Sequence, residues 1–315
     1  MQNTDFINVL ICCDENFVQH AGVFMNSVLA NTASPERMRF FWIADQSVTA
    51  SSREKLRQIV EARHGRLEVI TPDLERLKSA YISNQYSVAT YYRLMIGEIL
   101  PADVEKCIYC DCDMIALGDL AELWAEDISP NPIGAVTDHA MVLSQKNFAT
   151  RREQLGMGEK DHYFNAGLLV IDLKAWREGR FGEKTLQLAT TRQFRSHDQD
   201  VLNMVFCGNW HVLPSRWNCM PAIYGFHAKL FMNLGRFPDV VDARKRPGIV
   251  HYAGRYKPWE FPATKGFNDA YYRYLAQTPF AATFVPKKSP QNEKKTLRGE
   301  LTRIGIGNVL YGLRG

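Results

Sequence analysis

Lys106–Leu117 reads KCIYCDCDMIAL, an apolar stretch with two aspartates near its middle. Its length and composition are typical of a buried β-strand. Because side chains two positions apart in a strand project to the same face, Asp111 and Asp113 are predicted to point into one site. Strand-like and helix-like segments alternate before this stretch, which favours an α/β fold with a Rossmann-like, mainly parallel central sheet flanked by helices.

The alternation can be followed along the chain. We expect strands at 6–13, 38–45, 66–71, 106–117, 132–138 and 164–173, and helices at 18–31, 53–63, 90–100 and 197–206. Ser51 and Ser52 are candidate caps for the second helix. Ligands of doubly wound sheets bind beyond the carboxyl ends of the strands, and Asp111 and Asp113 are expected at such an end.

The charge of the chain is unevenly distributed. Residues 287–315 contain seven Lys/Arg and two Asp/Glu, a net charge of +5, whereas the rest of the 315 residues sums to −1. We therefore divide the chain into one domain, 1–285, and a basic C-terminal tail, 286–315. A basic tail on a neutral body fits an anionic membrane surface better than a nucleic acid, and a solvated unstructured tail is the alternative.

Two further features of the sequence bear on its location. No apolar stretch approaches the roughly 20 residues that span a bilayer. The first residues, MQNTDFINVLICC, lack the basic region and the cleavage site of a secretory signal. We expect a cytoplasmic protein, either free or peripheral on the inner face of the cytoplasmic membrane.

Two carboxylates at the end of a buried strand repel each other unless a cation lies between them. Oxygen ligands of this kind suit Mg²⁺ or Mn²⁺, and these ions commonly keep positions open for substrate phosphate. Asp111 and Asp113 are therefore candidate metal ligands, and a pair of exposed turn residues is the alternative.

Cysteines surround the same two aspartates. Cys107 and Cys110 form a C-x-x-C pattern that zinc or redox sites use. No second pair follows at zinc-site spacing, and in a strand these two side chains would face opposite sides. We interpret them as small buried side chains among seven reduced cysteines.

A second polar cluster, HYAGRYKPW, spans His251–Trp259 and follows the apolar run Gly248–Val250. Imidazole is a good Mn²⁺ ligand beside carboxylates. Gly254 permits close approach of the backbone to a phosphate, and Lys257 offers a point charge for it. A satisfied core histidine is the alternative for His251.

Taken in order along the chain, these motifs resemble those of retaining glycosyltransferase family 8, most closely the bacterial lipo-oligosaccharide and lipopolysaccharide galactosyl- and glucosyltransferases. The resemblance covers about residues 7–259 and is carried by CCDENF, TYYRL, YCDCDMI, FNAGLLVIDL, HDQDVLN and HYAGRYKPW. It implies a GT-A fold with a D-x-D motif, Mn²⁺ or else Mg²⁺ as cofactor, UDP-galactose or UDP-glucose as donor, and a role in lipopolysaccharide or other surface glycan synthesis.

The resemblance also implies roles for single residues. The metal ligands would be Asp111, Asp113 and His251. The nucleotide and diphosphate would be bound by Cys12, Asp14, Asn16, Arg93, Gly254 and Lys257. The donor-sugar and acceptor residues would be Asp138, Asn165, Asp198 and Gln199. The family often has Ala at the position of Cys12, which leaves the contribution of that side chain open.

The chemistry of these groups favours retention of configuration. An amide such as Gln199 is a poor covalent nucleophile, unlike the paired carboxylates of retaining hydrolases. We therefore expect front-face attack, with the leaving phosphate accepting the proton of the acceptor. Without the resemblance, Asp198 would be interpreted as a helix cap and Asn165 as a bulge residue.

Two other function classes remain at this point. One is a metal-dependent phosphohydrolase or nucleotidyltransferase using Asp111 and Asp113, and the other is a sugar-nucleotide or glycan-binding module without catalysis. Galactose and glucose differ at one hydroxyl, so the sequence does not separate the two donors. The acceptor pocket is expected in the irregular region 209–235.

Overall fold

The computed structural model describes residues 6–44, 46–72, 92–143, 145–224, 238–254, 257–260 and 268–285. Within these ranges seven strands form the central sheet, in the order β3-β2-β1-β4-β7-β6-β8, and a small second sheet pairs β5 with β9. The first four strands in this order, β3, β2, β1 and β4, are parallel to one another. β7 runs antiparallel to both of its neighbours, β4 and β6. The strands are β1 Ile7–Cys13, β2 Met38–Ala44, β3 Arg66–Ile70, β4 Lys106–Cys110, β5 Met114–Ala116, β6 Ile133–Thr137, β7 Phe164–Asp172, β8 His211–Val212 and β9 Ile249–His251. The predicted mainly parallel α/β fold is confirmed.

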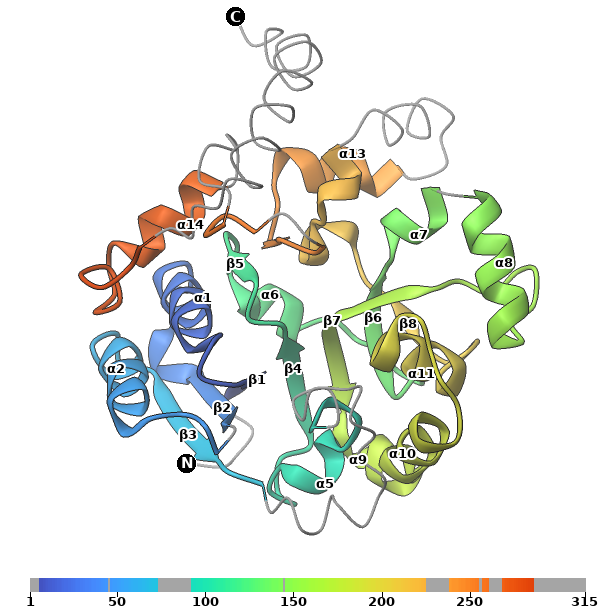
Figure 1. Cartoon of the computed structure of the whole chain (residues 1–315), viewed down its shortest axis with the longest axis horizontal. Helices are drawn as coiled ribbons and strands as arrows, with labels where there is room; N and C mark the ends of the chain where they lie inside the picture. The colour runs from blue at the N-terminus through green and yellow to red at the C-terminus, as the bar shows by residue number, and fades with distance from the viewer. Residues whose placement is uncertain are drawn as a thin grey trace, which may run out of the picture.

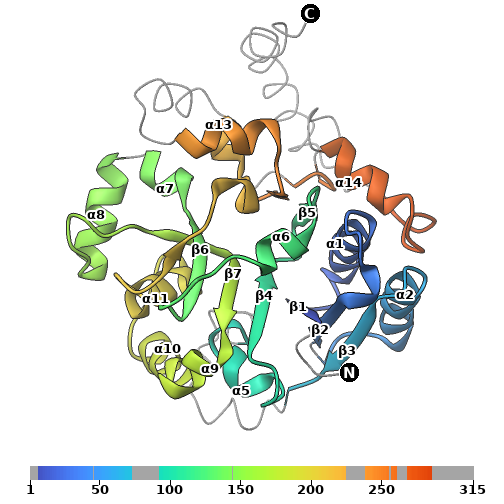
Figure 2. The same cartoon turned by 180° about the vertical axis from the view of Figure 1, so that it is seen from behind.

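Helices cover both faces of the sheet, with α1 and α2 beside β1–β3 and α9 to α11 beside β7 (Figures 1 and 2). Alternate residues of β1 enter two different hydrophobic clusters, Val9 and Ile11 the first, Leu10 and Cys12 the second. A strand buried on both faces in this way is typical of a doubly wound sheet. The helices are α1 Val18–Ala30, α2 Ala50–Glu61, α5 Ile96–Ile99, α6 Leu120–Trp124, α7 His139–Leu143, α8 Gln145–Leu155, α9 Leu173–Glu178, α10 Phe181–Thr191, α11 His197–Val205, α13 Pro238–Lys245 and α14 Asn268–Leu275, with 3₁₀ turns η2 Pro35–Arg37, η3 Ser215–Asn218 and η4 Pro221–Tyr224.

The stretch 106–117 is two strands, so the prediction of one continuous strand is wrong. β4 belongs to the central sheet, where Cys110 pairs with Leu168, whereas β5 belongs to the small sheet, where Met114 pairs with His251. The chain has to change direction between the two sheets. Asp111 and Asp113 lie in this junction, beyond the carboxyl end of β4.

Two helix predictions also need correction. The side chain that caps α2 is Thr49, whose hydroxyl accepts a hydrogen bond from the Ser52 backbone, so Ser51 and Ser52 lie inside the helix. The described part of the stretch 90–100 is helical at 92–94 and again in α5, Ile96–Ile99, so the predicted helix is present but interrupted by a turn at Met95. Gly97 in this short helix packs against Trp176, because a β-carbon at this position would lie 2.3 Å from Cδ1 of the Trp176 ring.

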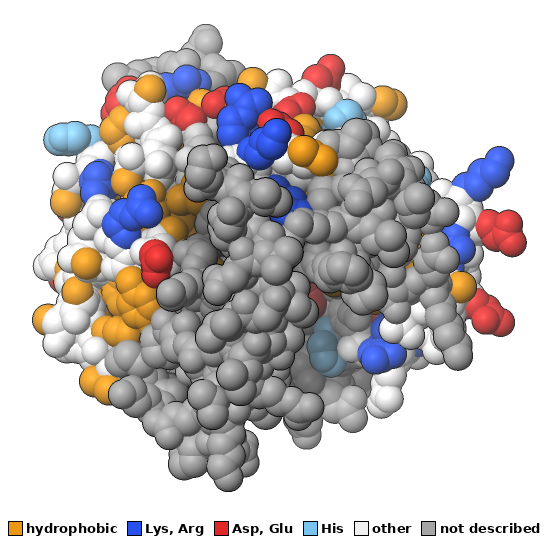
Figure 3. All heavy atoms as spheres, turned by 90° about the horizontal axis from the view of Figure 1, so that it is seen from above, with side chains coloured by type: hydrophobic (Ala, Val, Ile, Leu, Met, Phe, Trp, Pro, Cys, Tyr) orange, Lys and Arg blue, Asp and Glu red, His pale blue; other side chains and the backbone are white. Residues whose placement is uncertain are grey.

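The tail at 286–315 lies outside the described residues, as does part of the expected acceptor region, residues 225–235. In the described part of the chain, no helix is long and apolar enough to cross a membrane. Seen from above, the described surface carries acidic and basic side chains interspersed with hydrophobic ones (Figure 3). This mixture agrees with the near-zero net charge of the sequence before the tail.

Candidate active site

The two aspartates of the D-x-D stretch are held by backbone pairing on both sides. The Asp111 N–H donates to the Gly167 carbonyl at 2.8 Å, which continues the pairing of β4 with β7. The Asp113 carbonyl accepts from the Tyr252 N–H at 2.9 Å. Both side chains are partly exposed, and they lie where the central sheet gives way to the small one.

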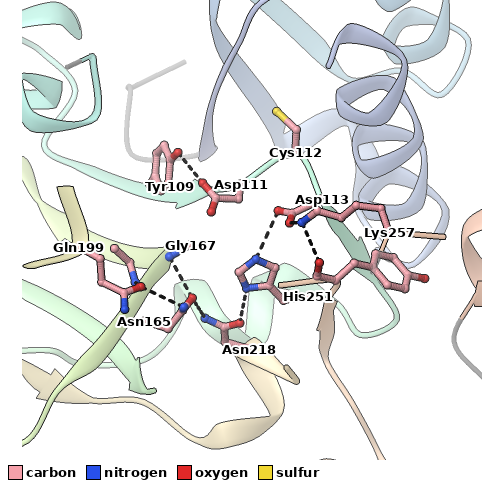
Figure 4. A network of polar contacts seen from close by, with 12 residues as sticks. Tyr109, Asp111, Cys112, Asp113, Asn165, Gly167, Gln199, Asn218, His251 and Lys257 are labelled. Carbon is pink, nitrogen blue, oxygen red and sulfur yellow. Dashed lines mark hydrogen bonds and ion pairs between the residues drawn. The ribbon is translucent and has the colours of Figure 1, made fainter. Parts of the chain in front are cut away.

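His251 joins them from the end of β9, opposite Met114 in the small sheet. Each of Asp111, Asp113 and His251 offers one ligand atom, and the three atoms lie within 4.8 Å of one another. His251 Nε2 is 3.3 Å from Asp113 Oδ1 (Figure 4). Two carboxylates and an imidazole in this arrangement fit a small divalent cation such as Mn²⁺, so the residues present fit the metal that the sequence predicts.

Two cationic side chains neutralise these carboxylates. Arg93 forms ion pairs with Asp111 and with Asp198, the latter at 2.6 Å. Lys257 forms an ion pair with Asp113 and also donates to the Tyr252 carbonyl at 2.8 Å. Both cations are therefore placed beside the ligand atoms, where the phosphates of a nucleotide would also carry negative charge.

The pKa values of the two aspartates shift in opposite directions. Burial raises the pKa of Asp111; Arg93 opposes this shift and the nearby Asp113 reinforces it. Burial also acts to raise the pKa of Asp113, but the charged, imidazolium form of His251 together with Lys257 holds that pKa well below its usual range. Asp113 is therefore a carboxylate at neutral pH, the form that binds a cation.

Gly167 is a site residue that sequence reasoning missed. A β-carbon at this position would lie 2.5 Å from His251 Cε1 and 2.9 Å from Asp111 Oδ2. Both distances are shorter than the contacts that a β-carbon makes in proteins, so only glycine fits between His251 and Asp111. The N-A-G pattern of β7 was the available signal, because a glycine inside a strand often marks a close approach.

Asn165, Gln199 and Asp138 form a second group on the other side of Gly167. The Gln199 amide donates to Asp138 Oδ2 at 2.9 Å, and its oxygen accepts from Asn165 Nδ2 at 3.0 Å. The register between β6 and β7 shifts at this point, since Ala135 pairs with Leu169 but Val136 with Asn165. Asn165 itself pairs with Val136 and lies just before the irregular residues 166–168 of β7, so it borders the bulge that the alternative interpretation assigned to it, and it also contacts the predicted site residues.

Asp198 and Gln199 lie in the first turn of α11. Asp198 does not cap the helix, because the N-cap position is Ser196 and the Asp198 carboxylate is paired with Arg93. Its neighbour Asp200 accepts from the Ser196 N–H at 2.8 Å instead. The residue between the cap and Asp198, His197, has a left-handed φ of 45°, a strained conformation of a kind that concentrates at functional sites.

A buried hydrogen-bonded group of Tyr163, Asp200 and Arg151 contacts Gln199. Tyr163 accepts from the Gln199 amide at 3.2 Å and donates to Asp200 at 2.6 Å. Asp200 is fully buried and pairs with Arg151 at 3.1 Å. Burial, followed by the nearby Asp200, raises the pKa of Tyr163, so its hydroxyl stays protonated. Neither Tyr163 nor Arg151 was predicted as a site residue.

Apart from Arg93, the residues expected at the nucleotide lie at or just beyond the carboxyl end of β1 and after β9. Asp14 Oδ2 accepts from Asn16 Nδ2 at 3.3 Å, and Asp14 Oδ1 is buried with no partner among the described residues. Cys12 is nearly buried, and its carbonyl accepts from the Cys112 thiol at 3.4 Å. Gly254 has a left-handed φ of 86°, and apart from its chain neighbours no atom of the described residues lies within 4 Å of a β-carbon built there.

The cysteines beside the D-x-D motif do not form a ligand set. Cys107 and Cys110 enter different hydrophobic clusters on opposite faces of the sheet, as predicted. All seven cysteines are free thiols, and six of them are buried. Burial raises the pKa of both Cys107 and Cys110, which keeps them protonated and poor ligands.

The sequence of this chain is similar to those of known glycosyltransferases. The family model of glycosyl transferase family 8 matches residues 8–263. General stress protein A of Bacillus subtilis is 26% identical over 88% of this chain and 96% of its own length. A lipopolysaccharide 1,2-glucosyltransferase of Escherichia coli is 28% identical over 99% of this chain and 93% of its own.

Solved structures agree with this placement. The crystal structure of the galactosyltransferase LgtC with donor and acceptor sugar analogs has a TM-score of 0.70 at 26% identity, covering 92% of this chain and 100% of LgtC. The apo structure of the bifunctional glycosyltransferase WbbM has a TM-score of 0.78 at 23% identity, covering 89% of this chain and 51% of that one, and shows the fold alone. This chain therefore belongs to glycosyl transferase family 8 and is a hexosyltransferase with a GT-A fold.

Proposed function

We propose that the enzyme transfers galactose or glucose from a UDP-sugar to a glycan acceptor, with retention and with Mn²⁺ bound by Asp111, Asp113 and His251. The observation that carries this proposal is the convergence of these three ligand atoms within 4.8 Å, with Lys257 beside them. A cation at this position would stabilise the negative charge that builds on the diphosphate as it leaves. Lys257 adds a fixed positive charge from the protein itself.

The nucleotide would extend from this point toward β1. Asp14, whose buried Oδ1 has no partner among the described residues, would accept a hydrogen bond from the base, and Asn16 would contact the ribose. Cys12 would contribute its backbone. Gly254 would bring the backbone close to the diphosphate, while Arg93 would reach the donor sugar and the adjoining phosphate.

The sugar would lie between the metal group and the Asn165–Gln199–Asp138 group. In the transfer step the acceptor oxygen bonds to the anomeric carbon on the face from which the phosphate oxygen departs. The acceptor proton goes to that phosphate oxygen. Gln199 offers a neutral dipole to the positive charge that develops on the sugar, and Asp198 holds Arg93 toward the leaving group.

The names of the relatives support a surface glycan as acceptor. Curated relatives include lipopolysaccharide 1,2-glucosyltransferases of Escherichia coli and a lipopolysaccharide 1,3-galactosyltransferase of Salmonella typhimurium. We propose that this enzyme acts on a lipopolysaccharide or lipo-oligosaccharide acceptor at the inner face of the cytoplasmic membrane.

A donor screen tests the proposed function. The enzyme is mixed with UDP-galactose, UDP-glucose or UDP-N-acetylglucosamine, with Mn²⁺ or with a chelator, and UDP release is followed. We expect slow UDP release from one of the two hexose donors, faster release with an acceptor, and none with the chelator. Binding without UDP release would indicate a glycan-binding module, and hydrolysis of nucleotides without a sugar would indicate a phosphohydrolase.

We propose that the basic tail at 286–315 binds anionic membrane. Each Lys or Arg near such a surface contributes about 1 kcal/mol of binding free energy. Deleting the residues after Pro286 should release the enzyme from vesicles that contain anionic lipid, while turnover on a soluble acceptor is unchanged. Co-sedimentation with these vesicles measures the effect, and unchanged sedimentation of the shortened enzyme would contradict it.

Tyr163→Phe should lower kcat by about tenfold, because Gln199 loses one of its two hydrogen-bond acceptors and can rotate away from its position, at a cost of about 1.4 kcal/mol. Tyr274→Phe is the matched control. It also removes a buried hydroxyl, one hydrogen-bonded to Asn31 at 2.6 Å, but on α14. Each variant should lose about 1–3 kcal/mol of unfolding free energy, and equal effects on kcat would contradict a special role for Tyr163.

A further inference from the structure

Asn218 lies between the metal group and the sugar group, at the end of η3, and is fully buried. Its Nδ2 donates to Asn165 Oδ1 at 2.9 Å, and its Oδ1 lies 2.9 Å from His251 Nδ1 (Figure 4). Sequence reasoning placed this residue in the irregular region expected to form the acceptor pocket. The structure instead places it in contact with a candidate metal ligand.

The direction of this hydrogen-bond chain is fixed from outside by two backbone N–H groups, which can only donate. Ala166 N–H donates to Gln199 Oε1 at 3.1 Å, and Gly167 N–H donates to Asn165 Oδ1 at 3.1 Å. These two backbone donors therefore fix which atom of the Gln199 amide and which atom of the Asn165 amide is the oxygen. Asn165 Oδ1 faces Asn218, so Asn218 has to present its NH₂ group there.

The other end of Asn218 is then an oxygen, which can only accept. A hydrogen bond between Asn218 Oδ1 and His251 Nδ1 requires a proton on Nδ1. His251 Nε2, the nitrogen that faces Asp113, is left as the atom with the free lone pair. This is the tautomer that a metal ligand needs at Nε2.

We propose that Asn218 is a positioning residue that holds the neutral His251 ring as the Nδ1–H tautomer and so keeps Nε2 free for the divalent cation. This inference rests on the cation site of the proposed function. The orientation of Asn218 is then set by the N-A-G segment of β7, so that one strand orders both the Gln199 amide and the metal ligand.

The Nε2–H tautomer of His251 competes with the Nδ1–H tautomer that Asn218 favours. Asp113 Oδ1 is 3.3 Å from His251 Nε2 and would accept a proton from it. With Asn218 removed, that contact would favour the proton at Nε2, the atom that the cation requires. Loss of such an outer partner of a metal-bound histidine commonly weakens metal affinity by about 10–100-fold.

Three variants test this proposal. Asn218→Leu removes the acceptor for the Nδ1 proton, whereas Asn218→Asp keeps an acceptor there. The matched control is Asn26→Leu, which also removes a buried Asn, one that lies in α1 and whose partners are Arg63 and the Tyr274 carbonyl. Proton positions are read from the ring ¹⁵N signals of histidine-labelled, metal-free protein at about pH 9, above the usual His pKa. The His251 signals are assigned by their loss in His251→Gln.

We expect the proton at Nδ1 in wild type, in Asn218→Asp and in Asn26→Leu, and at Nε2 in Asn218→Leu. Mn²⁺ affinity, measured by electron paramagnetic resonance without nucleotide, should fall by about 10–100-fold in Asn218→Leu only. A proton at Nε2 of His251 in wild type or in Asn218→Asp would overturn the proposal. If Asn218→Leu does not fold, the result for Asn218→Asp decides. A wild type that binds no Mn²⁺ overturns the cation site itself. Equal Mn²⁺ binding by wild type and Asn218→Leu overturns only the role of Asn218.

Discussion

Replacing Asp113 by Ala should lower the rate of hexosyl transfer by about a thousandfold or more, because a metal ligand supplies several kcal/mol of charge stabilisation in the transition state. Asp113 contacts both His251 and Lys257, so its loss removes one ligand and releases the cationic partner from its position. Mn²⁺ affinity should fall together with the rate. Transfer is measured as UDP release in the presence of acceptor, and Mn²⁺ binding by electron paramagnetic resonance.

The fold should survive this change, since Asp113 is a partly exposed junction residue and its backbone contact with Tyr252 does not need the side chain. Asp127→Ala is a suitable control, because it removes an exposed carboxylate whose partner is the Ser129 backbone. The control should transfer hexose at the wild-type rate. Normal metal-dependent turnover by Asp113→Ala, with an unchanged melting temperature, would show that the metal site has been assigned wrongly.

Gly167→Ala should cost about a hundredfold in kcat/KM and weaken Mn²⁺ binding, although only one methyl group is added. The new β-carbon would meet His251 Cε1 at 2.5 Å and Asp111 Oδ2 at 2.9 Å, so at least one ligand has to move by roughly 1 Å. A displacement of that size at a reacting centre commonly costs about this much. Steady-state kinetics and Mn²⁺ titration measure the two effects.

Gly156→Ala separates this effect from a general loss of stability. Gly156 has a left-handed φ of 69° and open space around it, so the substitution strains the backbone away from the site. It should lower the unfolding free energy by about 1 kcal/mol and leave Mn²⁺ affinity unchanged. The interpretation of Gly167 fails if both glycine variants lose Mn²⁺ affinity to the same extent.

Much of the fold was predictable because strands β1, β2, β4 and β7 are apolar runs that are almost completely buried in the sheet. The division of 106–117 into two strands was not. Its apolar pattern continues through both, and the break arises because β5 pairs with β9, more than 130 residues further along the chain. A pattern within one segment carries no information on which sheet each half will join.

The site divides in the same way. Asp111, Asp113 and His251 were predicted together from the family resemblance, because carboxylates and an imidazole beyond strand ends left other interpretations open on their own, and the structure brings their ligand atoms together. Gly167 and Asn218 matter through what they contact in three dimensions. Asn218 lies within an irregular segment with no periodicity, and its partners Asn165 and His251 come from two different strands.

The central claim, a divalent cation between Asp111, Asp113 and His251 that binds the donor diphosphate, is tested most directly by anomalous diffraction. Crystals grown with Mn²⁺ and UDP are measured at the manganese absorption edge. We predict one strong anomalous peak within about 2.0–2.3 Å of both carboxylates and of His251 Nε2, with phosphate oxygens completing the shell. A peak held by other residues, or UDP bound at these residues without any peak, would contradict the account.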